Sequence, residues 1–294
     1  MDKPETGTPR SRPRPVPGPA QLTRGMRRLL LVATILVVLA GVALFVFSER
    51  TEDWFAWTVT PPLTAAFLGA AYWASAVVEW TSSRASAWAD ARVAVPSVFV
   101  FTTLTLGVTL IHLDRFHLGA DLAIVTRAIT WAWIAVYVVV PVLMVVLWVA
   151  QRRVPGGDPP RRYPLPGLLR LAVALSAVLL LVAGGWLLLA PQDAADWWPW
   201  ELTPLTGRAI GAWLVGLGVS AAQTVLEADA RRARPVAAGA IALAVLVSVA
   251  LARYGADVAW GTLPAAVLVA ALAAWAVMGA AIIAVERRGP RVPT

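Results

Sequence analysis

The sequence contains no cysteine and only two histidines, His112 and His117. Without cysteine, disulfide frameworks, thiolate metal sites, cysteine nucleophiles and iron–sulfur clusters are excluded. The two histidines are an incomplete ligand set for haem or zinc, so a loop or interface position is predicted for both. We therefore expect neither a metal nor a cofactor. No serine or threonine has a placed base that would indicate hydrolase chemistry.

Charged residues are also scarce. They make up 14% of the 294 residues, whereas 59% are hydrophobic, and one soluble core could not bury so much apolar surface. The excess must face lipid. A net charge of +8 would suit nucleic acid if a folded soluble domain carried a basic face. Here the basic residues lie in short segments between apolar runs, so no nucleic-acid partner is expected.

Eight apolar runs are each long enough to cross a hydrocarbon core of roughly 30 Å. Only helices or closed barrels satisfy their backbone in lipid, and these runs lack the alternation of barrel strands. The sequence therefore predicts an all-α, polytopic membrane protein with eight transmembrane helices. The first run lacks a small-residue cleavage site and is predicted to be an anchor. The runs cover approximately residues 29–47, 61–80, 94–112, 122–149, 168–190, 204–226, 235–252 and 263–285.

The basic residues predict the orientation. If the runs cross the membrane in turn, all but five of the 25 lysines and arginines fall on the side of the N-terminus. Cytoplasmic segments are enriched in these residues, so both termini are predicted to be cytoplasmic. The abundance of alanine, valine, arginine, proline and tryptophan is typical of a high-GC bacterium, which indicates the bacterial cytoplasmic membrane.

An internal repeat is the strongest signal in the sequence. Residues 53–61, DWFAWTVTP, recur as residues 196–204, DWWPWELTP, at an offset of 143. The tetrapeptide ADAR occurs at 89–92 and again at 228–231, at an offset of 139. The offset falls slowly, as small loop deletions in a duplicated chain would produce. We expect two parallel four-helix repeats (4+4), related by a pseudo-twofold axis along the membrane normal.

The repeat defines the expected domain organisation. The N-terminal segment is rich in proline and arginine and has too little apolar surface to fold. The expected parts are a disordered basic cytoplasmic tail at 1–26, the first four-helix repeat at 27–150, a cytoplasmic linker at 151–166, the second four-helix repeat at 167–288 and a cytoplasmic tail at 289–294.

Repeated polar and aromatic residues gather at the predicted outer ends of the helices, and two interpretations stay open. Tryptophans there suit an aromatic belt, and charges at helix ends suit the helix dipole. Alternatively, these residues fold over a shared external vestibule and bind a polar ligand. Arg208 is included because a charge within a span is a functional candidate, although it could also snorkel. The candidate ligand-binding residues are Asp53, Trp54, Trp57, Arg115, Asp121, Asp196, Trp197, Trp200, Arg208, Arg253 and Asp257.

Two further matches predict helix starts and close packing. Thr60-Pro61 and Thr203-Pro204 place a capping hydroxyl and then a proline where the second and sixth spans begin. Small residues four positions apart predict that these two spans pack closely near the centre of the bundle. The small residues are Ala65 with Gly69, and Gly207 with Gly211.

The middle of the spans offers no charge. No acidic or basic residue is expected there, which argues against a proton- or sodium-coupled carrier with a buried carboxylate. Glu79 and Glu227 fall near the cytoplasmic ends of their spans, and no special role is assigned to them.

No motif in the sequence identifies a function. The first expectation is transport or binding of a small or lipid-like ligand through an extracytoplasmic vestibule, which needs a polar-lined cavity between the repeats. The alternative is a non-catalytic membrane scaffold or assembly subunit. An intramembrane enzyme acting on lipid is ranked last. The expected partners are the lipid bilayer and a small-molecule or lipid ligand, and no oligomeric state is assigned.

Overall fold

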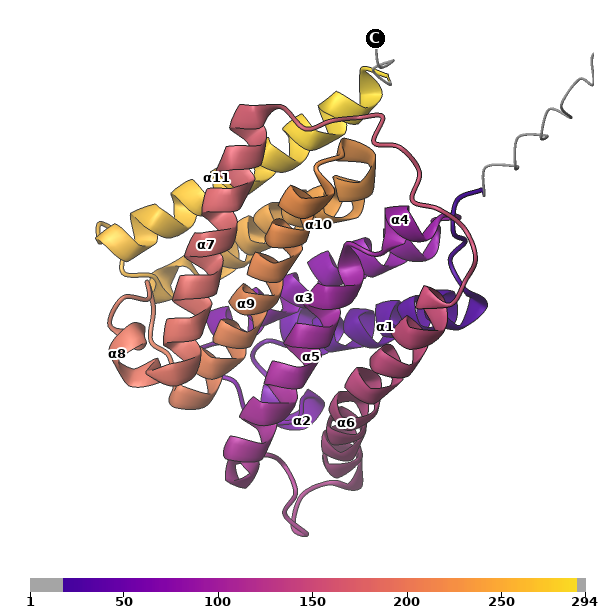
Figure 1. Ribbon diagram of the computed structural model, residues 1–294. Helices are drawn as coiled ribbons and strands as arrows, with labels where there is room; N and C mark the ends of the chain where they lie inside the picture. The colour runs from indigo at the N-terminus through magenta and orange to yellow at the C-terminus, as the bar shows by residue number, and fades with distance from the viewer. Residues whose placement is uncertain (1–17, 290–294) are drawn as a thin grey trace, which may run out of the picture.

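The computed structural model describes residues 18–289, and its regular secondary structure is helical throughout (Figure 1). This confirms the all-α prediction for the described residues. The long helices are α1 (Arg24–Gly41), which continues into the π-helix η1 (Val42–Val46), α3 (Pro62–Ser83), α5 (Ala94–Ile111), α6 (Ile124–Arg152), α7 (Gly167–Leu189), α9 (Pro204–Glu227), α10 (Ala230–Arg253) and α11 (Leu263–Arg287). The short helices are α2 (Thr51–Trp54), α4 (Trp88–Ala91) and α8 (Pro191–Ala195), with 3-10 turns η2 (Leu113–Arg115) and η3 (Gly255–Asp257).

Seven helices of the described chain are long and apolar enough to cross a membrane, counting α1 and η1 as one. This finding is consistent with a polytopic membrane protein. The expected second span, α3, is not among the seven, because serines, threonines, Tyr72 and Glu79 lower its hydropathy. It is nevertheless deeply enclosed, with 15 of its 22 residues buried. A helix that other helices cover does not need the fully apolar surface of one that faces lipid.

The two halves of the chain, residues 24–152 and 167–287, interlock at the centre. Helix α3 packs most extensively against α1 of its own half and α10 of the other half. Helix α9 packs in the same way against α7 of its own half and α5 of the other. Helices α6 and α11 lie at the periphery, against α5 and α10 respectively (Figure 1). Each half therefore supplies one central helix, α3 or α9, and one helix that packs against the central helix of the other half.

The bundle has two ends. The linker side carries residues 153–166, which join α6 to α7, together with α4 and the start of α10. The opposite side carries the loops at 47–61, 112–123, 190–203 and 254–262.

Residues 18–23 belong to the predicted disordered tail, but the structure packs them against the linker side. The Ala20 amide donates to the Gly157 carbonyl at 3.1 Å, and the Leu22 amide donates to the Ser86 carbonyl at 2.9 Å. Helix α1 already begins at Arg24. The prediction of disorder is therefore wrong for residues 18–26, because the backbone there finds partners in the rest of the fold. Residues 1–17 and 290–294, the remainder of the predicted tails apart from Gly289, lie outside the described residues.

The two Thr-Pro pairs behave differently. The Thr203 hydroxyl accepts from the Thr206 amide at the start of α9, and Pro204 is the first helical residue, as predicted. Helix α3 instead begins at Pro62 with Pro61 as the N-cap, and no side chain caps it. The prediction for Thr60 is wrong because the first copy has an extra proline, which moves the helix start one residue further along the chain.

Two of the four predicted small residues, Gly69 and Gly211, lie where helices approach closely. A Cβ at Gly69 would lie within 3 Å of Phe45, in η1. A Cβ at Gly211 would lie 2.8 Å from the carbonyl oxygen of Gly184 in α7. Both central helices thus use glycine to contact the first long helix of their own half, and they contact each other only weakly.

We predict that Gly184→Ala destabilises the protein, because its Cβ would meet the Gly211 carbonyl and the Val215 amide at 2.8 Å. Overpacking of this kind costs about 1–3 kcal/mol. The adjacent Gly185 is the control, since a Cβ there meets no atom within 4 Å. Unfolding of purified protein in detergent, by heat or by SDS titration, measures both variants. Equal stability of the two would contradict the packing described here.

Candidate functional site

The matched tryptophans of the opposite side divide into buried and exposed members. Trp57 is buried against Phe55 and Phe116, and Trp200 is buried and donates its indole N–H to Thr64 Oγ1 at 2.9 Å. Trp54 is 42% exposed and Trp197 is 60% exposed. The exposed pair suits the aromatic belt, whereas the buried pair forms part of the protein core.

The charged candidates of the opposite side do not gather around one shared site. Asp53 pairs with Arg50 at 2.7 Å and Arg115 pairs with Asp114 at 3.1 Å, both between neighbours in the sequence. The remaining aspartates are exposed, and none of the ion pairs among residues 18–289 includes them. They are Asp121, Asp196 and Asp257. A ligand-binding role for these residues stays a prediction.

The two remaining candidates, Arg208 and Arg253, satisfy the last carbonyl groups of helices. Arg253 Nη1 donates to the Phe45 carbonyl near the end of η1, and Arg208 Nε donates to the Leu188 carbonyl at the end of α7, at 2.6 and 3.1 Å. Such terminal carbonyls have no partner within their own helix. These arginines therefore tie helix ends together, Arg253 doing so between the two halves.

Arg208 also reaches the other half through His112. Its Nη1 lies 2.8 Å from His112 Nε2. An arginine only donates, so Nε2 is the accepting, unprotonated nitrogen. Burial and the Arg208 charge lower the pKa of His112, which favours this neutral form. His112 thus lies at a contact between the two halves, and His117 is a loop residue that contacts Thr58 and the Phe55 carbonyl.

On the linker side, four charged side chains form a network that joins the halves. Glu227 accepts from Arg92 Nη2 at 2.7 Å and from Arg232 Nη1 at 2.8 Å. Asp158 of the linker accepts from the same two arginines at 2.8 and 3.2 Å. The side chains of Arg232 and Glu227 are only 3% and 6% exposed. Sequence reasoning assigned Glu227 no role, because its partners come from separate segments.

Asp158 stabilises this network as an anion. Burial alone would raise its pKa, but hydrogen bonds from Arg92 and the charges of Arg232 and Arg92 outweigh burial and lower it. We interpret this network as the clamp that holds the linker, α9, α10 and the start of α5 together.

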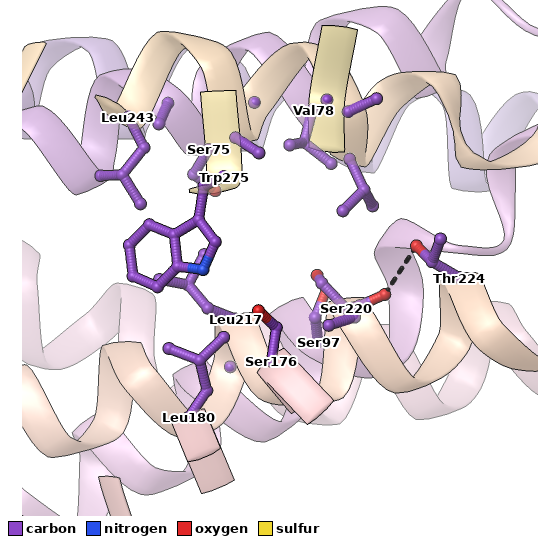
Figure 2. A pocket seen from close by; sticks show the side chains of 18 of the residues that line it. Ser75, Val78, Ser97, Ser176, Leu180, Leu217, Ser220, Thr224, Leu243 and Trp275 are labelled. Carbon is purple, nitrogen blue, oxygen red and sulfur yellow. Dashed lines mark hydrogen bonds between the residues drawn. The ribbon is translucent and has the colours of Figure 1, made fainter. Parts of the chain in front are cut away.

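A first cavity, of 120 Å³, lies between the two halves and nearer to the linker side (Figure 2). Its wall is mainly apolar, with a few hydroxyl groups. Ser97 and Thr224 use their hydroxyls on carbonyls of their own helices, at 2.8 and 3.0 Å, and Trp275 projects into the space from α11 (Figure 2). It therefore differs from the polar, outward-facing vestibule that the sequence led us to expect.

A second and larger cavity, of 460 Å³, lies within the first half between α1, α3, α5 and α6. Along α1 and η1 it extends from Ala33 to Phe47, which is about 20 Å at 1.5 Å per residue. Its wall is almost entirely aliphatic and aromatic. Midway along it, the hydroxyls of Tyr72 and Tyr137 hydrogen-bond to each other at 2.7 Å and so join α3 to α6.

Glu79 lines the linker-side end of this larger cavity and is 2% exposed. Its Oε1 accepts from the Ser75 hydroxyl at 3.0 Å, while no group within residues 18–289 hydrogen-bonds its Oε2. Sequence reasoning missed this residue because its position near a helix end suggested exposure. The available signal was the spacing of Tyr72, Ser75 and Glu79, which places three polar side chains on one face of an apolar helix.

The aromatic ring of Phe101 separates the two cavities. It lines both of them, and it packs on Trp213 of α9 with ring centroids 4.0 Å apart. Phe101 and Val98 of α5, which also lines both, thus form a shared wall between a space inside the first half and a space between the halves.

No family model, curated protein or solved structure matches this chain. The features that bear on function are therefore the two cavities and the charged groups around them.

We predict that Glu227→Ala destabilises the protein by about 3 kcal/mol, because it removes the shorter of the two ion pairs of the buried Arg232 and leaves only the longer one, with Asp158. The control is Asp114→Ala, which removes an exposed pair and should change stability by less than about 1 kcal/mol. Thermal unfolding in detergent compares the two. Indistinguishable melting temperatures would show that the linker-side network is not a clamp.

Proposed function

We propose that this protein binds a lipid-like ligand within the membrane, in the cavity between α1, α3, α5 and α6. The observation that carries the proposal is the cavity itself: 460 Å³, apolar walls and a few polar groups at fixed positions. Ligand sites commonly have about 300–1,000 Å³ and this kind of lining. The proposed site lies at membrane level, whereas the sequence alone led us to expect an external vestibule.

Lateral access supports a ligand that arrives from the bilayer. Helices α1 and α6 touch at their linker-side ends, where Gly25 lies against Leu147. At the other end α2 contacts both α6 and η1. Between these contacts the rim of the cavity includes Leu39, which is 61% exposed, and Ala132, which is also exposed. A hydrocarbon chain could therefore enter sideways without crossing water.

The eight-span, 4+4 architecture is part of the proposal, and recurring backbone bonds support it. The Trp88 amide donates to the Ala20 carbonyl, and the Ala230 amide donates to the Tyr163 carbonyl. On the opposite side, the His117 amide donates to Ala56 and the Ala259 amide to Pro199. In both cases the two donor residues are 142 positions apart in the sequence and the two acceptor residues are 143 positions apart. Helix α1 with η1 and helix α7 are also equally long, 23 residues, at an offset of 143.

These bonds favour a different register from the one read from the sequence. The ADAR match at 89–92 and 228–231 implies an offset of 139, whereas the hydrogen bonds of Leu22 to Ser86 and of Leu165 to Ala228 imply 142 for the acceptors. The difference of three residues is close to one helical turn. In the structural register α4 and α5 together correspond to α10, and His117 has a counterpart, Ala259.

In this register the two cavities are counterparts. Positions of the larger cavity in α1, α3 and α5 match positions of the smaller one at these offsets: Ala33 with Ser176, Val37 with Leu180, Glu79 with Ala221 and Phe101 with Leu243. The space in the second half is the smaller one, 120 Å³ against 460 Å³. We therefore propose one ligand site per chain, in the first half, beside a smaller relic of it in the second.

We predict that a long-chain alcohol with a mid-chain diazirine labels residues around the larger cavity of the protein in nanodiscs. Ala40→Trp fills the cavity and should reduce this labelling several-fold. Val32→Trp is the matched control, since Val32 lies on the same helix, is exposed and does not line the cavity. Peptide mapping by mass spectrometry reads out the labelled positions. Labelling confined to outward-facing residues, unchanged by Ala40→Trp, would instead favour a scaffold without a ligand.

The proposed orientation has the linker side in the cytoplasm of a bacterium. Because the chain has no cysteine, single cysteines report sidedness directly. A membrane-impermeant maleimide should label Gln192→Cys on the opposite side of intact cells, and should label Arg162→Cys only after lysis; both positions are exposed. The reverse pattern would overturn the orientation.

A further inference from the structure

We infer that the ligand is a long single-chain amphiphile whose polar end donates a hydrogen bond to Glu79 Oε2. The donor is a hydroxyl or an ammonium group. The inference rests on the proposed function and adds the chemical class and the direction of the ligand: head toward the linker side, chain toward the opposite side.

Glu79 Oε2 is a buried oxygen without a hydrogen-bond partner among residues 18–289. Buried polar atoms are almost always hydrogen-bonded, and each exception needs an explanation. Glu79 is 2% exposed, its Oε1 is used by Ser75, and Oε2 has no partner among residues 18–289 while the residue lines the cavity. An ionisable side chain at this depth is costly unless something pairs with it. The oxygens of an ionised carboxylate only accept hydrogen bonds, so the ligand group that pairs with the ionised form of Glu79 is a donor.

The depth of Glu79 in the bundle also suits the head of an amphiphile. Glu79 lies four residues before the end of α3 at Ser83, about 6 Å from the linker-side end of that helix. An amphiphile in the adjacent leaflet keeps its head at a similar depth. Its chain can therefore enter between α1 and α6 beyond the contact of Gly25 with Leu147, with its head directed toward the linker-side end of the cavity, where Glu79 lies.

The part of the larger cavity beyond Glu79 is long and narrow. Beyond Glu79 the cavity continues past Tyr72 and Tyr137 to Phe47 and Trp54 near the opposite side. The hydroxyls of the two tyrosines hydrogen-bond to each other at 2.7 Å, so these residues present mainly ring surface to the chain. About 20 Å of apolar slot suits one extended hydrocarbon chain.

The smaller cavity differs from the larger one at the position of Glu79. The position equivalent to Glu79 there is Ala221, which lines the smaller cavity. That cavity lacks the carboxyl group and is also the smaller of the two, 120 Å³ against 460 Å³. Loss of both together is expected if the carboxyl group serves a bound molecule.

The test uses three photoreactive probes of one chain length on the full-length protein in phosphatidylcholine nanodiscs. The probes are a primary alcohol, a primary amine and the methyl ether of the alcohol, which cannot donate. We expect the alcohol and the amine to label the cavity roughly tenfold more than the ether, which is the effect of one hydrogen bond to a charged group. Glu79→Leu should remove this preference and leave labelling by the ether unchanged.

Two further variants keep the test decisive. Glu286→Leu removes a carboxylate at the end of α11, outside the cavity, and should leave the preference intact. If Glu79→Leu does not fold, Glu79→Gln decides, because it keeps an acceptor oxygen and removes the charge: the amine should lose its advantage while the alcohol keeps part of it. Equal labelling by all three probes in the native protein would overturn the inference and leave the proposed function standing. Absence of cavity labelling by every probe would overturn the proposed function itself.

Discussion

The close approach of each central helix to the first long helix of its own half is the constraint on which the rest of the structure depends. Gly69 brings α3 against η1, the continuation of α1, and Gly184 with Gly211 bring α9 against α7. With these two pairs fixed at short distance, α10 and α5 fill the remaining sides of α3 and α9. Helices α6 and α11 are left at the edges, and the larger cavity lies where α6 does not close fully against α1.

Hydropathy predicted most of this fold, because lipid imposes a simple rule on the helices that face it. Seven spans satisfy that rule by length and composition. It failed for α3, whose surroundings are protein and whose serines and Glu79 are covered by neighbours. The segment at 18–26 was misread for a related reason. Its prolines and arginines look unable to fold alone, but residues 86–88 and 157 supply the partners its backbone needs.

The candidate site was much harder to predict from the sequence. Repetition drew attention to the opposite side, where Trp57 and Trp200 belong to the core and Arg253 binds a helix end. Repetition identifies what both halves need, which is mainly structure. Glu79 has no repeated counterpart, and its importance depends on the face of α3 on which it lies and on the space beside it. Neither is visible without coordinates. The Arg92–Glu227–Arg232 network was missed similarly, since its members are far apart in the sequence.

The ring of Phe101 has a consequence for communication between the halves. Because the ring lines both cavities, a rotation that widened one space would narrow the other. The ring also packs on Trp213 of α9. A molecule held in the first half would therefore press, through this aromatic side chain, on the contact between α5 and α9 by which the two halves hold each other.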